Sequence, residues 1–113
     1  MHEYSIVQAL VSRVELEARS RGASSVKRLN IRIGELSGVD PELLKVAYDT
    51  FRDGTMCHQA SLELRQVPAR WICRACERQL AKGELLQCPE CGAPARLAEG
   101  DEIILDQIQL EVP

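Results

Sequence analysis

Residues 27–41 read KRLNIRIGELSGVDP and decide the fold. In the first ten of these residues, apolar and polar side chains alternate, which is typical of a half-buried β-strand. We expect this strand to span Lys27–Leu36, with a buried face made of Leu29, Ile31 and Ile33. The stretch ends with Asp40 followed by Pro41, an N-cap residue before a proline at the first helical position. It therefore predicts a strand that leads directly into a helix.

One amphipathic helix is predicted on each side of this strand. The first spans Tyr4–Arg21 and is followed by Gly22, a favourable residue just beyond a helix end. Its apolar residues recur at steps of three and four: Ile6, Val7, Leu10, Val11, Val14 and Ala18. The second helix is expected to run from Pro41 to about Arg52, with Leu44, Ala47, Tyr48 and Phe51 as its apolar stripe.

Two further strands complete the predicted sheet. Ser61–Val67 alternates again, and Glu102–Val112 carries Ile104, Ile108, Leu110 and Val112 on one face, which Asp106 interrupts. An interruption of this kind is compatible with a β-bulge. The fold class expected is α+β: two helices packed on a three-stranded sheet of antiparallel type, with an inserted four-cysteine module of zinc-ribbon type. We expect an α+β domain made of residues 1–69 plus 99–113, and a metal-binding module made of residues 70–98.

The inserted module contains four of the five cysteines of the chain. They form two C-x-x-C pairs, Cys73 with Cys76 and Cys88 with Cys91, which is the spacing of a four-thiolate zinc site. Four protein ligands leave the metal no open position, so we interpret the zinc as structural. Spacing alone also allows iron held as in rubredoxin, a redox-active dithiol, or a zinc ribbon that binds nucleic acid.

Composition and charge limit the functional classes. The chain has 113 residues and a formal net charge of −3, whereas a nucleic-acid-binding protein usually has a clear basic excess. No apolar run approaches the roughly 18–20 residues of a membrane span, and the start MHEYSIVQAL does not resemble a signal peptide. No nucleophile–base pair or phosphate-binding glycine loop is evident. We therefore expect a soluble, cytoplasmic protein that is not an enzyme and binds neither nucleic acid nor membranes.

The N-terminal sequence Met1-His2-Glu3 is the second candidate metal site. The amine of Met1, the amide nitrogen of His2 and its imidazole Nδ1 form fused chelate rings that suit Ni²⁺ or Cu²⁺. Glu3 adds an amide nitrogen or a carboxylate. The alternative is that His2 is an exposed and inert residue near a terminus, which is the common case. The other histidine, His58, follows Cys57 in a predicted loop, and Asp40 is interpreted as a helix cap.

Together, these motifs resemble the HypA family of nickel metallochaperones. The resemblance rests on Met1-His2-Glu3, on Ile31–Leu36 leading into Val39-Asp40-Pro41, and on the two C-x-x-C pairs. It covers essentially the whole chain. It implies a carrier that works in the maturation of nickel–iron hydrogenase, together with a GTPase of the HypB type, and delivers nickel to the hydrogenase large subunit.

The resemblance also implies the ligands of each metal. Nickel, Ni(II), is expected at His2, with Glu3 and the Met1 amine as co-ligands and Asp40 nearby. Structural zinc, Zn(II), is expected at Cys73, Cys76, Cys88 and Cys91. A monomer or weak homodimer is expected, and a second client such as urease remains open. The rival interpretation is a zinc-ribbon module for protein–protein interaction that transfers no nickel.

Overall fold

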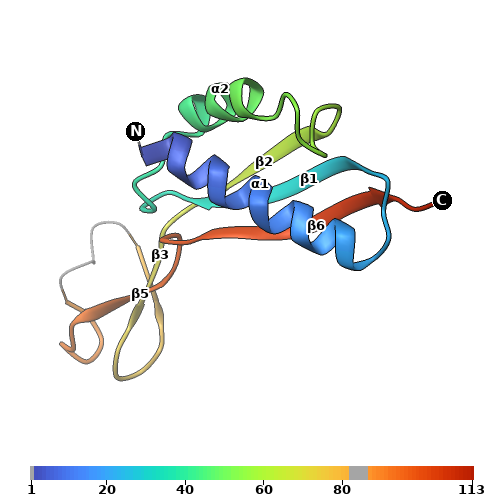
Figure 1. The fold of residues 1–113 in the computed structure, drawn as a ribbon. Helices are drawn as coiled ribbons and strands as arrows, with labels where there is room; N and C mark the ends of the chain where they lie inside the picture. The colour runs from blue at the N-terminus through green and yellow to red at the C-terminus, as the bar shows by residue number, and fades with distance from the viewer. Residues whose placement is uncertain (1, 82–86) are drawn as a thin grey trace. The chain divides into compact units, whose positions relative to one another are not determined.

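The computed structural model describes residues 2–81 and 87–113, and within these it contains two helices and two three-stranded sheets (Figure 1). The first sheet has the strand order β2-β1-β6 and the second has the order β4-β3-β5. The predicted α+β class with an inserted four-cysteine module is confirmed. The elements are α1 (His2–Ser20), β1 (Ser25–Gly34), α2 (Pro41–Phe51), β2 (Ser61–Val67), β3 (Arg70–Cys73), β4 (Gln79–Leu80), β5 (Ala95–Glu99) and β6 (Ile103–Glu111).

The chain divides into two compact units. The first, called the α+β unit below, comprises Met1–Arg32, Val39–Arg65 and Ile104–Pro113. The second, called the cysteine unit, comprises Ile33–Gly38 and Gln66–Ile103. The end of β1 therefore belongs to the compact unit that contains the cysteines.

Helix α1 forms the apolar stripe that its sequence predicts. Val7, Val11, Val14 and Ala18 are all buried, and Ile6 and Leu10 are half-buried. The helix ends in a Schellman motif, in which Ala23 N–H donates to Ala18 O at 2.9 Å and Gly22 N–H to Arg19 O at 3.1 Å. Gly22 has a φ of 68°, a conformation that glycine adopts without a steric cost.

Helix α2 begins at the predicted cap. One carboxylate oxygen of Asp40 accepts hydrogen bonds from the backbone N–H groups of Glu42, at 2.9 Å, and Leu43, at 3.4 Å. Pro41 occupies the first turn, where its missing N–H needs no partner. In the α+β unit, α2 packs against α1, and the rings of Tyr4 and Phe51 meet edge to face at 5.6 Å. Leu44, Ala47 and Tyr48 are buried.

The first sheet combines two pairings. Ser24 N–H donates to Glu111 O and Gly34 N–H to Glu102 O, both at 2.8 Å, so β1 and β6 run antiparallel. Glu35 N–H donates to Val67 O at 2.8 Å, so the C-terminal ends of β1 and β2 lie side by side. Figure 1 shows these two strands running in the same direction, joined by α2. The antiparallel character of the sheet therefore lies in the β1–β6 pair, because a helical crossover joins strands that run in parallel.

The alternation of side chains along β6 is interrupted at Asp106. Arg32 Nε donates to both carboxylate oxygens of Asp106 at 2.8 Å, and the neighbouring Gln107 accepts from Asn30 Nδ2 at 3.0 Å. Two consecutive side chains of β6 therefore reach β1 side chains on the same face of the sheet.

The cysteine unit contains short strands that the sequence pattern did not predict. β3, β4 and β5 have four, two and five residues, and β3 pairs antiparallel with both of the others. Strands this short carry too few side chains to establish a period of two.

No helix of the described residues is long and apolar enough to cross a membrane.

Candidate metal centre

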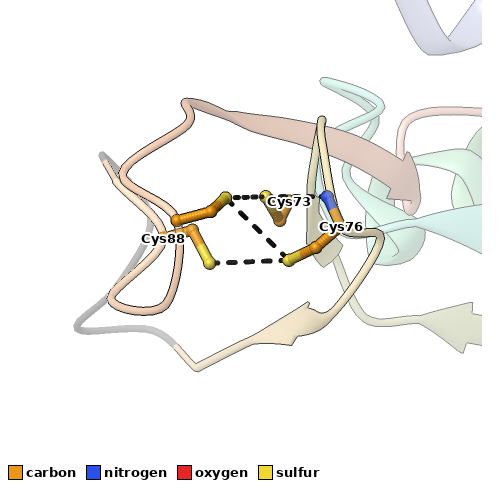
Figure 2. Close-up of side chains that lie close together, drawn as sticks. Cys73, Cys76 and Cys88 are labelled. Carbon is orange, nitrogen blue, oxygen red and sulfur yellow. Dashed lines mark hydrogen bonds between the residues drawn. The ribbon is translucent and has the colours of Figure 1, made fainter.

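The four cysteine sulfurs of the cysteine unit converge on one point (Figure 2). All four lie within 4.8 Å of one another. Three Sγ–Sγ distances are short: 3.2 Å for Cys73 and Cys91, 3.8 Å for Cys76 and Cys88, and 4.0 Å for Cys91 and Cys76. A tetrahedral zinc ion with Zn–S bonds of about 2.3 Å has sulfur–sulfur edges of about 3.8 Å. The donor set and its spacing therefore fit zinc.

Each C-x-x-C pair lies on a turn of the same construction. In the first turn, Glu77 N–H donates to Cys73 O at 3.1 Å and Cys73 N–H donates to Arg78 O at 2.9 Å. In the second turn, Gly92 N–H donates to Cys88 O at 2.8 Å and Cys88 N–H donates to Ala93 O at 2.9 Å. The two turns are equivalent residue by residue, with an offset of 15 positions.

This equivalence places Glu77 and Gly92 at the same position of their turns, the residue after the second cysteine. Both have left-handed backbones, with φ of 59° for Glu77 and 75° for Gly92. Among the described residues, Glu77 is the only residue other than glycine with a positive φ. A side chain in this conformation costs about 1–2 kcal/mol, and the first turn carries that cost while the second does not.

Two backbone amides favour a thiolate at Cys73. Cys76 N–H lies 3.4 Å from Cys73 Sγ and Ala75 N–H lies 3.3 Å from it. With the neighbouring thiol of Cys91, these hydrogen bonds lower the pKa of Cys73 to about 6, the amide of Cys76 contributing most. The backbone N–H of Ala93 lowers the pKa of Cys91, but its thiol neighbours outweigh that effect and raise it to about 12. Without a cation, the crowded sulfurs cannot all ionise, whereas a divalent metal replaces their protons.

The apolar cluster around these sulfurs is small. Cys73, Leu80 and Cys88 are buried, and Trp71, Ala93 and Ala95 pack against them. An apolar cluster of this size provides little stability from burial alone. When bound, zinc would cross-link the two turns, because four thiolate ligands complete its coordination. The chain's own residues hold the four sulfurs in place and leave no position for a substrate at such an ion.

The predicted nickel residues are partly brought together. Glu3, in the first turn of α1, accepts a hydrogen bond on its carboxylate from the backbone N–H of Asp40 at 3.2 Å. Residues 37 positions apart thus meet in the α+β unit at the start of both helices. His2 is the first residue of α1. Met1 and the side chain of His2 lie outside what the structure describes.

Cys57 and His58 lie apart from the four-cysteine cluster. The Cys57 side chain is fully buried, and burial raises its pKa to about 11. His58 is exposed, and its Nδ1 lies 3.0 Å from Thr55 O. Among the described residues, the only group of three or more possible metal ligands is the cluster of Cys73, Cys76, Cys88 and Cys91.

Two residues of the centre were missed by reasoning from the sequence. Trp71 packs against the buried cluster that contains Cys73 and Cys88, and Glu77 adopts the left-handed conformation of the first turn. An alignment of the two C-x-x-C turns on each other would have revealed the second, since Glu77 falls where Gly92 stands. Nothing in the sequence pattern pointed to Trp71.

Comparison with known proteins identifies the family. Residues 1–110 match the model of the family described as "Hydrogenase/urease nickel incorporation, metallochaperone, hypA". The chain belongs to the HypA family. It is 39% identical over 114 residues to the hydrogenase maturation factor HypA of Aquifex aeolicus, covering 99% of both chains. It is 40% identical to the factor of the same name from Nitrosospira multiformis, covering 97% of both.

Solved HypA structures share the fold. A solution structure titled HypA protein matches with a TM-score of 0.81 and 26% identity, covering 100% of this chain and 98% of that one. The nickel metallochaperone HypA from Helicobacter pylori matches with a TM-score of 0.74 and 23% identity, covering 98% of each chain. The resemblance drawn from the motifs is confirmed, and the chain is a member of a family of metallochaperone maturation factors.

Proposed function

We propose that this chain is a nickel carrier for hydrogenase maturation, and that it is not an enzyme. Ni(II) binds at the N-terminus through His2, with Glu3 and the Met1 amine as co-ligands and Asp40 beside them. Zn(II) binds at Cys73, Cys76, Cys88 and Cys91 and is structural. We assign nickel binding to a domain of residues 1–69 plus 99–113 and zinc binding to a module of residues 70–98. These functional segments have other boundaries than the two compact units.

The observation that carries the proposal is the hydrogen bond between Glu3 and Asp40, in a chain whose family is one of nickel metallochaperones. This bond brings the carboxylate of Glu3 and the backbone of Asp40 together at the start of α1. The amide N–H groups of the first turn of α1 have no acceptor within the helix. Deprotonation of such an amide costs no helical hydrogen bond. A square-planar Ni²⁺ site of nitrogen donors is therefore compatible with an intact α1.

A transfer protein must also release its cargo. Nitrogen donors at a chain end form an open site, whereas the four thiolates form a closed one. The two metals therefore bind at separate sites, and nickel dissociates more readily than zinc. We propose a GTPase of the HypB type and the hydrogenase large subunit as partners. We place this exchange in the cytoplasm, where reduced cysteines remain available for metal.

The test is a calorimetric titration of zinc-loaded protein with Ni²⁺. His2→Ala should abolish nickel binding at the N-terminus, whereas His58→Ala is the matched control, because these are the only two histidines in the chain. Nickel affinity should also fall steeply from about pH 8 to about pH 6, since protons compete for the imidazole and the terminal amine. Unchanged affinity in His2→Ala, with hydrogenase activity retained in cells, would contradict the proposal and favour an interaction module without nickel transfer.

The carboxylates can be tested without disturbing the fold. Asp40→Asn keeps a good N-cap for α2 but removes the charge, and Glu3→Gln keeps an oxygen that can accept from Asp40 N–H. A loss of nickel affinity in either variant, with an unchanged melting temperature, would assign that carboxylate to the nickel site.

A further inference from the structure

The four sulfurs of the metal centre form close pairs across the two turns. Cys73 Sγ lies 3.2 Å from Cys91 Sγ, and Cys76 Sγ lies 3.8 Å from Cys88 Sγ. Figure 2 shows the sulfurs of Cys76 and Cys88 directed toward one another from the two turns. Each pair takes one cysteine from the first turn and one from the second, so a bond within either pair would join the turns.

Each pair also combines an exposed cysteine with a buried one. Cys91 and Cys76 are exposed, whereas their partners Cys73 and Cys88 are buried. A small oxidant in the solvent reaches the exposed sulfur first, and the buried sulfur beside it can complete a disulfide. An exposed sulfur next to a second, resolving cysteine is the common arrangement of redox-sensitive thiols in proteins.

We propose that the cluster is a site of reversible oxidation by hydrogen peroxide, which forms the disulfides Cys73–Cys91 and Cys76–Cys88 and makes the chain release its zinc. This inference rests on the zinc site proposed above, because it concerns the same four sulfurs. Both disulfides join the two turns. They therefore replace the cross-link that the metal provides.

The reaction is the same for each pair. The exposed thiolate attacks one oxygen of the peroxide, so an S–O bond forms while the O–O bond breaks, and the other oxygen leaves as hydroxide and is protonated to water. The buried thiolate then attacks the sulfur of this sulfenic acid, and the S–S bond forms while the S–O bond breaks and the oxygen leaves as a second water. The two sulfurs lose two electrons, which reduce one peroxide to two waters. Each disulfide removes two of the four zinc ligands.

The new cross-link is important because the apolar cluster is small. It consists of two cysteines and Leu80, with Trp71 and two alanines against it. A reduced chain without zinc has no bond between the turns, whereas the two disulfides close loops that restrict the unfolded chain. We therefore expect the oxidised cysteine unit to stay folded without metal. A thiol reductant together with Zn²⁺ should restore the zinc-loaded form.

The experiment is a titration of the zinc-loaded protein with hydrogen peroxide, in which a chromophoric chelator measures the zinc released. Four thiols should be lost for each zinc ion released, while Cys57, which is buried outside the cluster, should stay reduced. Zinc content before peroxide is added tests the zinc site itself, and the changes after addition test the inference. Zinc release without disulfide formation, or full thiol oxidation with zinc retained, overturns the inference.

Mass spectrometry identifies the disulfides that form. Trypsin cleaves after Arg74 and Arg78, and endoproteinase Glu-C cleaves after Glu90, so each cysteine of the cluster lies on a peptide of its own. The expected products are the two peptide pairs that join the turns. Disulfides within a turn, or a disulfide between the two exposed cysteines, overturn the proposal.

A single substitution tests the pairing independently. In Cys91→Ser, the disulfide Cys76–Cys88 should still form, and Cys73 should be the cysteine of the cluster that remains reduced. Pairing within the turns would instead leave Cys88 reduced, which contradicts the proposal. The matched control Cys57→Ser removes the cysteine outside the cluster and should give the same two disulfides as the wild type. The wild-type peptide map decides the pairing even if Cys91→Ser folds poorly.

Tryptophan emission tests whether the disulfides replace the metal. Trp71 packs against the cluster, so the oxidised protein without zinc should keep the emission maximum of the zinc-loaded protein. Reduced protein from which a chelator has removed zinc should show the red-shifted emission of an exposed tryptophan. A red-shifted maximum in the oxidised protein as well would mean that the disulfides do not hold the unit together, and would overturn that part of the proposal.

Discussion

The α+β unit and the cysteine unit reach a stable fold by different chemistry. The α+β unit buries large aliphatic and aromatic side chains from both helices and β1, including Val7, Val11, Val14, Leu29, Ile31, Leu44 and Tyr48. In the cysteine unit, the cluster at the metal centre consists of two cysteines and Leu80, with Trp71 and two alanines against it. Burial of apolar surface can stabilise the α+β unit, whereas the cysteine unit needs a cross-link through its sulfurs. The following predictions test this division.

The largest effect is expected when the cross-link is removed. Cys88→Ser should lose zinc and unfold the cysteine unit, while α1 and α2 remain folded. Trp71 is the only tryptophan and packs against the cysteine cluster, so its fluorescence reports on that unit. Circular dichroism at 222 nm reports on the helices, which both lie in the α+β unit. Zinc content should therefore fall and tryptophan emission should change, while the helicity stays the same.

The matched control for this variant is Cys57→Ser. Cys57 is also fully buried, but it lies in the α+β unit and outside the cluster. This variant should keep its zinc and its tryptophan emission. A Cys88→Ser protein with full zinc content would show that the four sulfurs are not the zinc site.

The next largest effect is expected in the apolar core. Leu29 is fully buried on β1, and Leu29→Ala should lower the free energy of unfolding of the α+β unit by about 3 kcal/mol, because it leaves a cavity. Urea unfolding followed at 222 nm measures this loss. Leu16→Ala is the control, since Leu16 on α1 is 66% exposed and should change stability by less than about 0.5 kcal/mol. Loss of zinc from Leu29→Ala at native pH would contradict the division.

A smaller effect on the α+β unit is expected at alkaline pH. Burial raises the pKa of Cys57 from 9.0 to about 11 and that of Tyr48 from 10.0 to about 12. Each group keeps its proton longer in the folded state, so its contribution is complete below the unfolded pKa and lost as pH rises towards the folded pKa. The free energy of unfolding should fall by about 2–3 kcal/mol for each group between about pH 9 and 12.

Urea unfolding at a series of pH values measures this dependence. Tyr48→Phe, which removes the hydroxyl that donates to Ala60 O at 2.8 Å, should flatten the upper part of the profile. Cys57→Ala should flatten the lower part. An unchanged slope in both variants would mean that neither group is protonated more strongly in the folded state.

The smallest effect concerns the two cysteine turns. Glu77→Gly should stabilise the cysteine unit by about 1 kcal/mol by relieving the left-handed conformation, and Gly92→Ala should destabilise it by a similar amount. The ion pair between Glu77 and Arg96, at 3.8 Å, is exposed and should contribute little. Tryptophan emission during urea unfolding of the zinc-loaded protein compares the two variants. A destabilised Glu77→Gly protein would mean that the carboxylate outweighs the backbone strain.

Local signals made much of the fold predictable. Asp40-Pro41 gave the start of α2, Gly22 gave the end of α1, and alternation located β1, β2 and β6 to within two residues at each end. These features depend on neighbouring residues, and the sequence displays them directly. The spacing of the cysteines likewise predicted that four thiols would converge.

Contacts between distant residues were not predictable in the same way. The hydrogen bond from Asp40 N–H to Glu3 depends on how α1 packs against α2, and only the family resemblance suggested that the two residues are near each other. The sheet β4-β3-β5 depends on the cysteine turns, because two to five residues do not establish a pattern by themselves. The sequence pattern grouped Ile104 with Ile108 and Leu110, whereas in the structure Leu105 lines the same groove, between α1 and β6, as Ile108 and Leu110.

The close approach of Gly34 and Gly100 has a consequence for protein engineering. A side chain on either glycine would collide with backbone, that of Gly100 in one case and of Ala69 in the other. The same crossing is tied by Leu36 N–H donating to Gly100 O and by Ala69 N–H donating to Glu35 Oε1, both at 2.7 Å. Three segments that are distant in the sequence thus meet at this crossing, where hydrogen bonds join them. The cysteine unit therefore cannot be transferred as one continuous segment. A graft onto another scaffold must also include the segment Gly34–Leu36.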